Sequence, residues 1–132
     1  MIPRYRAWDG GSLCRMYSPS EVMVGDSCIW ILDEDSGSNE WIINNDLVLM
    51  QSTGLTDSAE KEIFEGDILN IETDEENVKV EVSWDSKHAL FVFESKKYNE
   101  KEALGELFED NSYPFKIIGN IHTNPELLEV EQ

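Results

Sequence analysis

The sequence predicts a mainly β fold, of the β-rich α+β kind, with a single helix. Apolar and polar residues alternate with period two in several runs, most clearly between Val78 and Val82, which is typical of half-buried strands. These runs are short, and clusters of Asp, Asn, Ser, Gly and Pro separate them, as expected for turns. One segment, near residues 99–109, has its apolar residues at helical spacing. A chain of 132 residues with 40% hydrophobic residues can bury a core, as one domain or two very small ones.

The N-terminal β-rich region, residues 1–55, is expected to consist of β-hairpins. Its first strand alternates two arginines with Tyr5 and Ala7, and an Asp-Gly-Gly-Ser turn follows. A second hairpin is expected across the polar loop 33–39. In chain order, the predicted strands of this region are 3–8, 13–17, 28–32, 41–43 and 46–50.

The C-terminal region, residues 56–132, is expected to contain further strands and the single helix. Asn99 is a candidate N-cap, and Glu102 follows three residues later as in a capping box. Gly105 inside the helix costs about 1 kcal/mol relative to alanine. The apolar stripe that defines the helix near 99–109 consists of Ala103, Leu104, Leu107 and Phe108. The predicted strands of this region are 68–71, 78–83, 89–94 and 115–121.

The charge of the chain limits its partners. The formal net charge is -18, and such a surface repels phosphate backbones, so direct nucleic-acid binding is not expected. Arg4, Arg6 and Arg15 are the only candidates for a basic patch. Charged residues interrupt the N-terminus, and no run of about 18 apolar residues occurs. We therefore expect a cytoplasmic protein without a membrane span.

The sequence offers no set of residues for catalysis. His88 and His122 are the only imidazoles, and neither lies near a nucleophile in a known arrangement. A calcium loop beginning at Asp33 would need Gly at its sixth position and Glu at its twelfth, where Ser38 and Asn44 stand. Phosphate-binding glycine loops are absent from the sequence. No catalytic residue, metal ligand or cofactor is predicted.

The densest polar cluster lies between Met50 and Leu69. A structural role is favoured, in which the glycines adopt positive φ and the short polar side chains hydrogen-bond nearby backbone groups. The alternative is a polar contact surface formed by Thr53, Asp57, Glu60, Glu65 and Asp67. The residues assigned to the structural motif are Thr53, Gly54, Leu55, Asp57, Glu65, Gly66 and Asp67.

Four runs together resemble the YopX family, small proteins of bacterial phages and prophages. They are Arg6–Asp9, Met50–Asp57, Lys61–Ile68 and Ile118–Leu128, in the order and spacing of the family. The resemblance implies a β-rich N-terminal part followed by a C-terminal SH3-like β-barrel with one inserted helix. It brings no catalytic residues, because the family has no established biochemical activity.

One departure from the family pattern concerns the turn after the Thr-Gly-Leu element. Family members often have an Asp-Lys-Asn-Gly type turn, whereas this chain has the run Asp57–Glu60. Without Asn-Gly a tight type I′ turn is not expected, so a type I or short helical turn is predicted.

These observations favour a non-enzymatic phage or prophage accessory protein that binds a host or phage protein through an acidic surface. Possible partner contacts are Glu60, Asp74, Glu75 and Glu76. A homo-oligomer is also expected, because exposed strand edges and aromatic residues favour self-association. Two alternatives stay open: an acidic DNA mimic that inhibits a host DNA-binding protein, and an uncharacterised enzyme.

Overall fold

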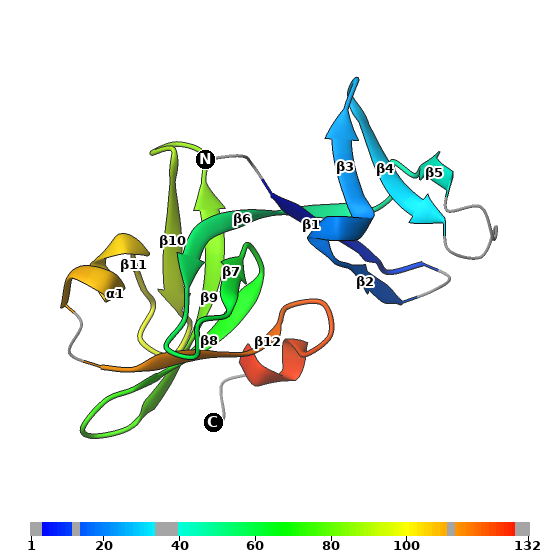
Figure 1. The fold of residues 1–132 in the computed structure, drawn as a ribbon. Helices are drawn as coiled ribbons and strands as arrows, with labels where there is room; N and C mark the ends of the chain where they lie inside the picture. The colour runs from blue at the N-terminus through cyan, green and yellow to red at the C-terminus, as the bar shows by residue number, and fades with distance from the viewer. Residues whose placement is uncertain (1–3, 12–13, 34–39, 111–112, 129–132) are drawn as a thin grey trace. The chain divides into compact units, whose positions relative to one another are not determined.

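The fold is mainly β, which confirms the predicted class. The computed structural model describes residues 4–11, 14–33, 40–110 and 113–128, so the predicted loop at 33–39 lies almost entirely outside the described residues. The described strands form three antiparallel sheets (Figure 1). The chain divides into two compact units, Met1–Ser52 and Thr53–Gln132. We call them the N-terminal unit and the C-terminal unit.

The N-terminal unit combines a hairpin with a three-stranded sheet. Strand β1 pairs with β2 and with the first half of β6, while the separate sheet has the order β3-β4-β5. Its core contains Ala7, Tyr17, Ile31 and Leu47, all less than 9% exposed. The elements are β1 (Tyr5–Asp9), β2 (Arg15–Tyr17), η1 (Pro19–Glu21), β3 (Val22–Gly25), β4 (Cys28–Asp33), β5 (Glu40–Ile43) and β6 (Val48–Thr56).

Strand β3 was not predicted. It pairs with β4 from Val22 opposite Ile31 to Gly25 opposite Cys28, which leaves a two-residue turn of Asp26 and Ser27. Both turn residues have positive φ, 51° and 61°, the geometry of a type I′ turn. The prediction missed this hairpin because Asp-Ser lacks the glycine that usually marks such a turn.

The C-terminal unit is built on one antiparallel five-stranded sheet in the order β11-β10-β9-β8-β12 (Figure 1). Its core is the buried side of this sheet, where the alternating valines of β9 meet Leu69, Phe93 and Phe115. The elements are β7 (Glu62–Phe64), β8 (Asp67–Glu72), β9 (Asn77–Asp85), β10 (Leu90–Ser95), β11 (Glu100–Ala103), α1 (Gly105–Asp110), β12 (Phe115–Asn120) and η3 (Pro125–Leu128).

The predicted helix near 99–109 is wrong in its first half. Residues 100–103 form β11, which pairs with β10, and the helix begins only at Gly105. Asn99 is no N-cap, because it lies in the β10–β11 turn with a φ of 53°. The run Glu-Lys-Glu has no apolar side chain to bury on a helix, whereas pairing with β10 gives its backbone hydrogen-bond partners.

The predicted short strand 46–50 is also wrong in its extent. Strand β6 begins at Val48 and continues to Thr56, so the Thr-Gly-Leu element lies in a strand instead of a connecting turn. Its last part neighbours β7 in the C-terminal unit. Gly54 has a φ of 79° within this strand, a conformation that glycine adopts without steric cost.

Candidate functional site

The loop between β6 and β7 is organised by the carboxylate of Asp57. Its Oδ1 accepts the backbone N–H groups of Ala59 and Lys61, each at 2.9 Å. Its Oδ2 accepts the N–H of Ile117 on β12, also at 2.9 Å. The residue is only 5% exposed. Burial alone would raise the pKa of Asp57, but the three backbone N–H groups and the charge of Lys61 together hold it below its ordinary value.

The next residue fixes the same loop to β12. Ser58 donates its N–H to the carbonyl of Phe115 at 2.9 Å, and its Oγ accepts the N–H of Phe115 at 3.0 Å. The loop itself is a three-residue turn: Glu60 donates to the carbonyl of Asp57 at 3.0 Å and has a φ of 64°. Strand β12 is the edge of the sheet, so Asp57 and Ser58 satisfy backbone groups that a further strand would otherwise pair.

The bend between β7 and β8 has a similar construction. The Oδ2 of Asp67, whose residue is 1% exposed, accepts the N–H of Phe64 at 2.8 Å. Gly66 has a φ of 86°. Its N–H donates to Val82 and its carbonyl accepts from Ile121, both at 2.8 Å. This one residue therefore joins β9 to the turn after β12.

Thr53 completes the motif by linking β6 to β7. Its hydroxyl donates to the carbonyl of Ile63 at 2.8 Å and accepts the N–H of Leu55 at 3.1 Å. The Leu55 side chain packs against the core. Of the five residues of the alternative contact surface, Thr53, Asp57 and Asp67 are buried. Their polar side chains bond the backbone of their own unit.

A hollow of about 360 Å³ opens on the same sheet, away from this motif. Its floor includes core residues from three neighbouring strands: Ile71, Val80 and Phe93. Tyr98 at its edge is 45% exposed. We call this hollow the β11 groove, and its lining is Ile71, Thr73, Val78, Val80, Phe93, Ser95, Tyr98, Glu100 and Glu102.

Two carboxylates stand at the rim of the β11 groove. In the register of the sheet Glu102 lies opposite Phe93, and Glu100 lies opposite Ser95. Residues directly opposite each other in an antiparallel pair point to the same face. Both glutamates therefore project from the edge strand on the side of the apolar floor, and both are exposed. Sequence interpretation missed them because it placed this segment in a helix, although their spacing of two is that of one strand face.

The predicted acidic contacts are divided between two places. Glu76 closes the β8–β9 turn, where its carbonyl accepts the hydroxyl of Thr73 at 2.6 Å. Its carboxylate accepts from Lys97 at 2.6 Å. Because Thr73 lines the β11 groove, this turn adjoins the groove, with Asp74 and Glu75 exposed at its tip. Glu60 lies instead in the loop bound to β12, at the opposite edge of the sheet.

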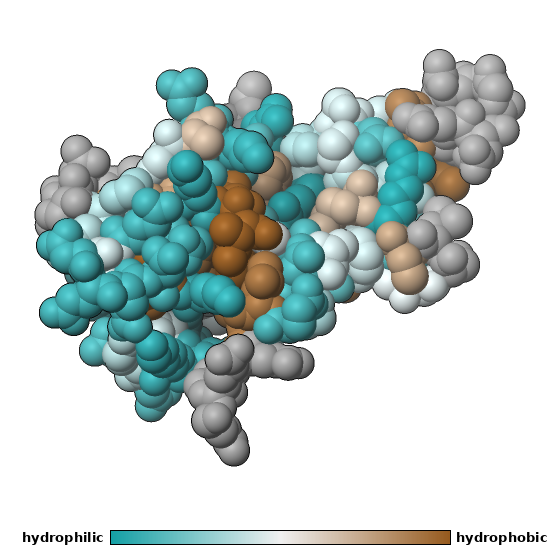
Figure 2. Space-filling view, turned by 90° about the horizontal axis from the view of Figure 1, so that it is seen from below, coloured by the Kyte–Doolittle hydropathy of each residue, from teal (hydrophilic) through white to brown (hydrophobic). Residues whose placement is uncertain are grey.

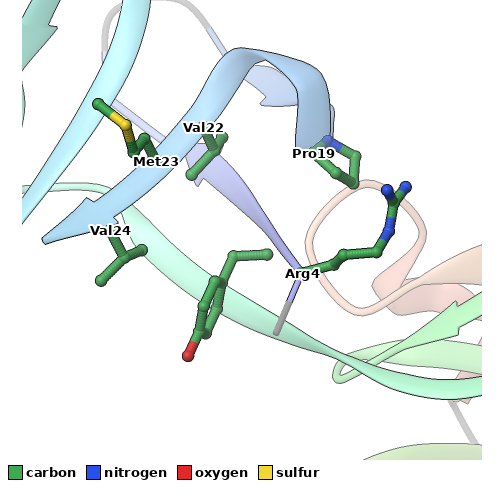
Figure 3. A pocket seen from close by; sticks show the side chains of 6 residues that line it. Arg4, Pro19, Val22, Met23 and Val24 are labelled. Atoms are coloured by element: carbon green, nitrogen blue, oxygen red, sulfur yellow. The ribbon is translucent and has the colours of Figure 1, made fainter. Parts of the chain in front are cut away.

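The N-terminal unit has a hollow of similar size, about 360 Å³, between the start of β1 and β3 (Figure 3). Among the described residues, its lining has both polar and apolar groups and no carboxylate. Its lining residues are Arg4, Tyr5, Pro19, Val22, Met23 and Val24.

The residues that could carry metal or acid–base chemistry are dispersed. Nowhere in the described part of the chain do three His, Cys, Asp or Glu side chains gather so as to hold a metal ion. His88 lies at the β9–β10 turn with its Nδ1 2.7 Å from Asp85 Oδ2. The hydrogen bond from His88 is the main cause that lowers the pKa of Asp85. Within the same described residues, no helix combines the length and apolar character needed to cross a bilayer.

Comparison with known proteins identifies the family. None of the curated proteins matches the chain in sequence. The crystal structure of protein EF1440 from Enterococcus faecalis is similar, with a TM-score of 0.62 and 28% identity, over 98% of this chain and 99% of that one. The crystal structure of YopX from Bacillus subtilis shares the fold, with a TM-score of 0.64 and 21% identity, over 96% and 98% of the two chains. The model of the YopX protein family matches residues 4–129. The resemblance is thereby confirmed, and the chain belongs to the YopX family.

Proposed function

We propose that this protein is a non-enzymatic binding module whose C-terminal unit receives an aliphatic and basic segment of a partner protein in the β11 groove. The observation that carries the proposal is the position of Glu100 and Glu102 beside an apolar floor. A lysine or arginine side chain fits this combination, because its apolar stem can cover Phe93 and Val78 while its charged head reaches a carboxylate.

The charge of the whole chain favours the same class of partner. With a net charge of -18, the protein attracts a basic segment before contact, and the association rate should fall as salt rises. Hydrophilic residues cover much of the face of the C-terminal unit seen in Figure 2, with a hydrophobic cluster among them. Tyr98 adds an exposed aromatic ring at the groove, and tyrosine is enriched in protein interfaces.

We also propose a fold for the C-terminal unit and a biological role for the chain. An SH3-like barrel is proposed for the C-terminal unit, on the basis of its five antiparallel strands and the family resemblance. Such barrels commonly act as interaction modules, which is an analogy at the level of fold. A phage or prophage accessory role in the cytoplasm of a host is proposed on the same basis.

The test uses a fluorescein-labelled hexapeptide in which lysine and valine alternate. Binding is measured by anisotropy at about 50 mM salt, where surface charges are weakly screened. The double variant Glu100→Lys with Glu102→Lys should lose about tenfold in affinity, since each exposed pair contributes up to about 1 kcal/mol. A peptide that alternates glutamate and valine should not bind.

The matched control is the double variant Glu72→Lys with Glu106→Lys. Each substitution adds two charges, so both double variants change the net charge from -18 to -14. Glu72 and Glu106 are exposed and do not line the groove. The control should bind like the natural protein. Equal losses of affinity in the two double variants would show that the peptide is attracted by the diffuse charge of the chain, as a DNA mimic would need. That result would refute binding in the β11 groove.

A further inference from the structure

Strand β11 is the end strand of the five-stranded sheet, next to β10 (Figure 1). Among the described residues, it pairs with β10 on one side and with no strand on the other. Its first three residues, from Glu100 to Glu102, are exposed. An end strand presents a row of backbone N–H and C=O groups to any further extended segment. We call this side of β11 the open edge.

The hydrogen bonding between β10 and β11 shows which backbone groups face the open edge. Leu104, just after β11, donates its N–H to the carbonyl of Phe91 at 2.9 Å, and this pair continues the register of the two strands. Hydrogen-bonded and non-hydrogen-bonded pairs alternate along an antiparallel ladder. The backbone groups of Glu102 and Glu100 therefore face β10, and those of Lys101 face the open edge.

We propose that the basic segment bound at the β11 groove is an antiparallel β-strand added to the open edge of β11. This proposal rests on the proposed function, because the same two glutamates select the segment. The strand pairs of this sheet are antiparallel, so an added antiparallel strand extends the ladder already present. In recognition of this kind, main-chain hydrogen bonds supply affinity and alternate side chains supply specificity.

The side chains of β11 define the sequence pattern that fits. Successive side chains of a strand point to opposite faces, so Glu100 and Glu102 lie on the face of the groove and Lys101 lies on the other face. Residues directly opposite each other attract when their charges are opposite and repel when their charges are alike. The partner is therefore an extended segment with lysine or arginine opposite the two glutamates and an apolar residue opposite Lys101.

Other occupants fit the open edge less well. A second copy of this chain would be repelled, because both copies have a net charge of -18. A nucleic acid would meet the same repulsion. A helical segment has its own backbone groups already bonded, so it would leave those of Lys101 to water.

The test uses the lysine–valine hexapeptide with methyl groups on selected backbone nitrogens. When its lysines lie opposite the glutamates, a valine lies opposite Lys101 and donates its N–H to the carbonyl of Lys101, whereas the N–H groups of the lysines point away from β11. Methylation of the valine nitrogens should weaken binding at least about tenfold, because it removes donors from the contact. Methylation of the lysine nitrogens should leave the dissociation constant within about threefold of that of the unmodified peptide. Anisotropy at about 50 mM salt measures both.

A pair of protein variants tests the same hydrogen bonds from β11. Lys101→Pro removes the N–H that faces the open edge, a position at which an end strand tolerates proline, and should weaken binding of the unmodified peptide about tenfold. Lys101→Ala removes the same charge but keeps the N–H, and it should not weaken binding. Circular dichroism verifies that both variants fold. The methylated peptides decide the question if Lys101→Pro does not fold.

The outcomes separate strand addition from the proposed function. Equal effects of the two methylation patterns, or a stronger effect of lysine methylation, would overturn the antiparallel strand. Equal losses in Lys101→Pro and Lys101→Ala would also overturn it. In these cases the proposed function stands if the substitutions of Glu100 and Glu102 still weaken binding. An unmodified peptide that does not bind at all would overturn both.

Discussion

The Oδ2 of Asp57 accepts the backbone N–H of Ile117 at 2.9 Å, although the two residues are 60 positions apart. Together with Ser58, this carboxylate occupies part of the open edge of β12, where the register with β8 shifts between Ile117 and Gly119. A short polar loop thus takes the place of a paired strand at this edge. The most polar part of the family motif is therefore explained by backbone hydrogen bonding.

Asp57→Asn should lower the free energy of unfolding by about 1–3 kcal/mol, because an amide can satisfy fewer of the three N–H groups than a carboxylate. Urea denaturation measures the change. Asp74→Asn is the matched control, since this carboxylate is exposed at a turn tip, and it should change stability by less than about 0.5 kcal/mol. Equal effects of the two substitutions would contradict the role given to Asp57.

The same carboxylate should make stability depend on pH. Its folded pKa lies below the ordinary value of 3.8, so its contribution is present above the unfolded pKa and is lost as pH falls through the folded pKa. The difference in unfolding free energy between the natural protein and Asp57→Asn should be constant above about pH 5 and should shrink in more acidic solution. A difference that stays constant down to about pH 2 would show that the pKa of Asp57 does not change on folding.

Glu60→Gly should stabilise the protein by several tenths to about 1 kcal/mol, because Glu60 has a φ of 64° and the left-handed conformation costs a non-glycine residue about 1–2 kcal/mol. Ala59→Gly in the same loop, where φ is not positive, should destabilise it. Thermal unfolding measures both. Binding of the lysine–valine peptide should be unchanged in Glu60→Gly, whereas a loss would assign Glu60 to the partner contact.

Gly119→Ala should destabilise the protein by about 1–3 kcal/mol, the range for a side chain forced into a packed site. A Cβ at this position would lie 2.5 Å from Asn124 Oδ1, which accepts the N–H of Asn120 at 3.3 Å. Gly105→Ala is the control, since a Cβ there meets nothing within 4 Å, and it should be neutral or slightly stabilising. A neutral Gly119→Ala would show that Asn124 moves without cost.

Local patterns predicted the class of fold well where one face of a strand is buried. The alternation of apolar and polar residues from Val78 to Val82 predicted the strand now seen as β9. Successive side chains of a strand point to opposite faces, so this pattern can be read from adjacent residues alone. The segment 100–103 shows the limit of this method. Its residues, Glu, Lys, Glu and Ala, favour a helix by intrinsic propensity, and pairing with β10 overrides that preference. The β11 groove was missed for the same reason.

The sequence by itself determined the mainly β class, the family and the two glycines with positive φ, Gly54 in strand β6 and Gly66 in the bend before β8. These depend on side-chain periodicity and on backbone conformations that only glycine adopts easily. The tertiary structure decided that Asp57 bonds to Ile117, that Glu100 stands at the rim of an apolar groove, and that Ile43 is exposed. Each of these is a relationship between strands, set by register and packing between residues distant in sequence, so no local pattern records it.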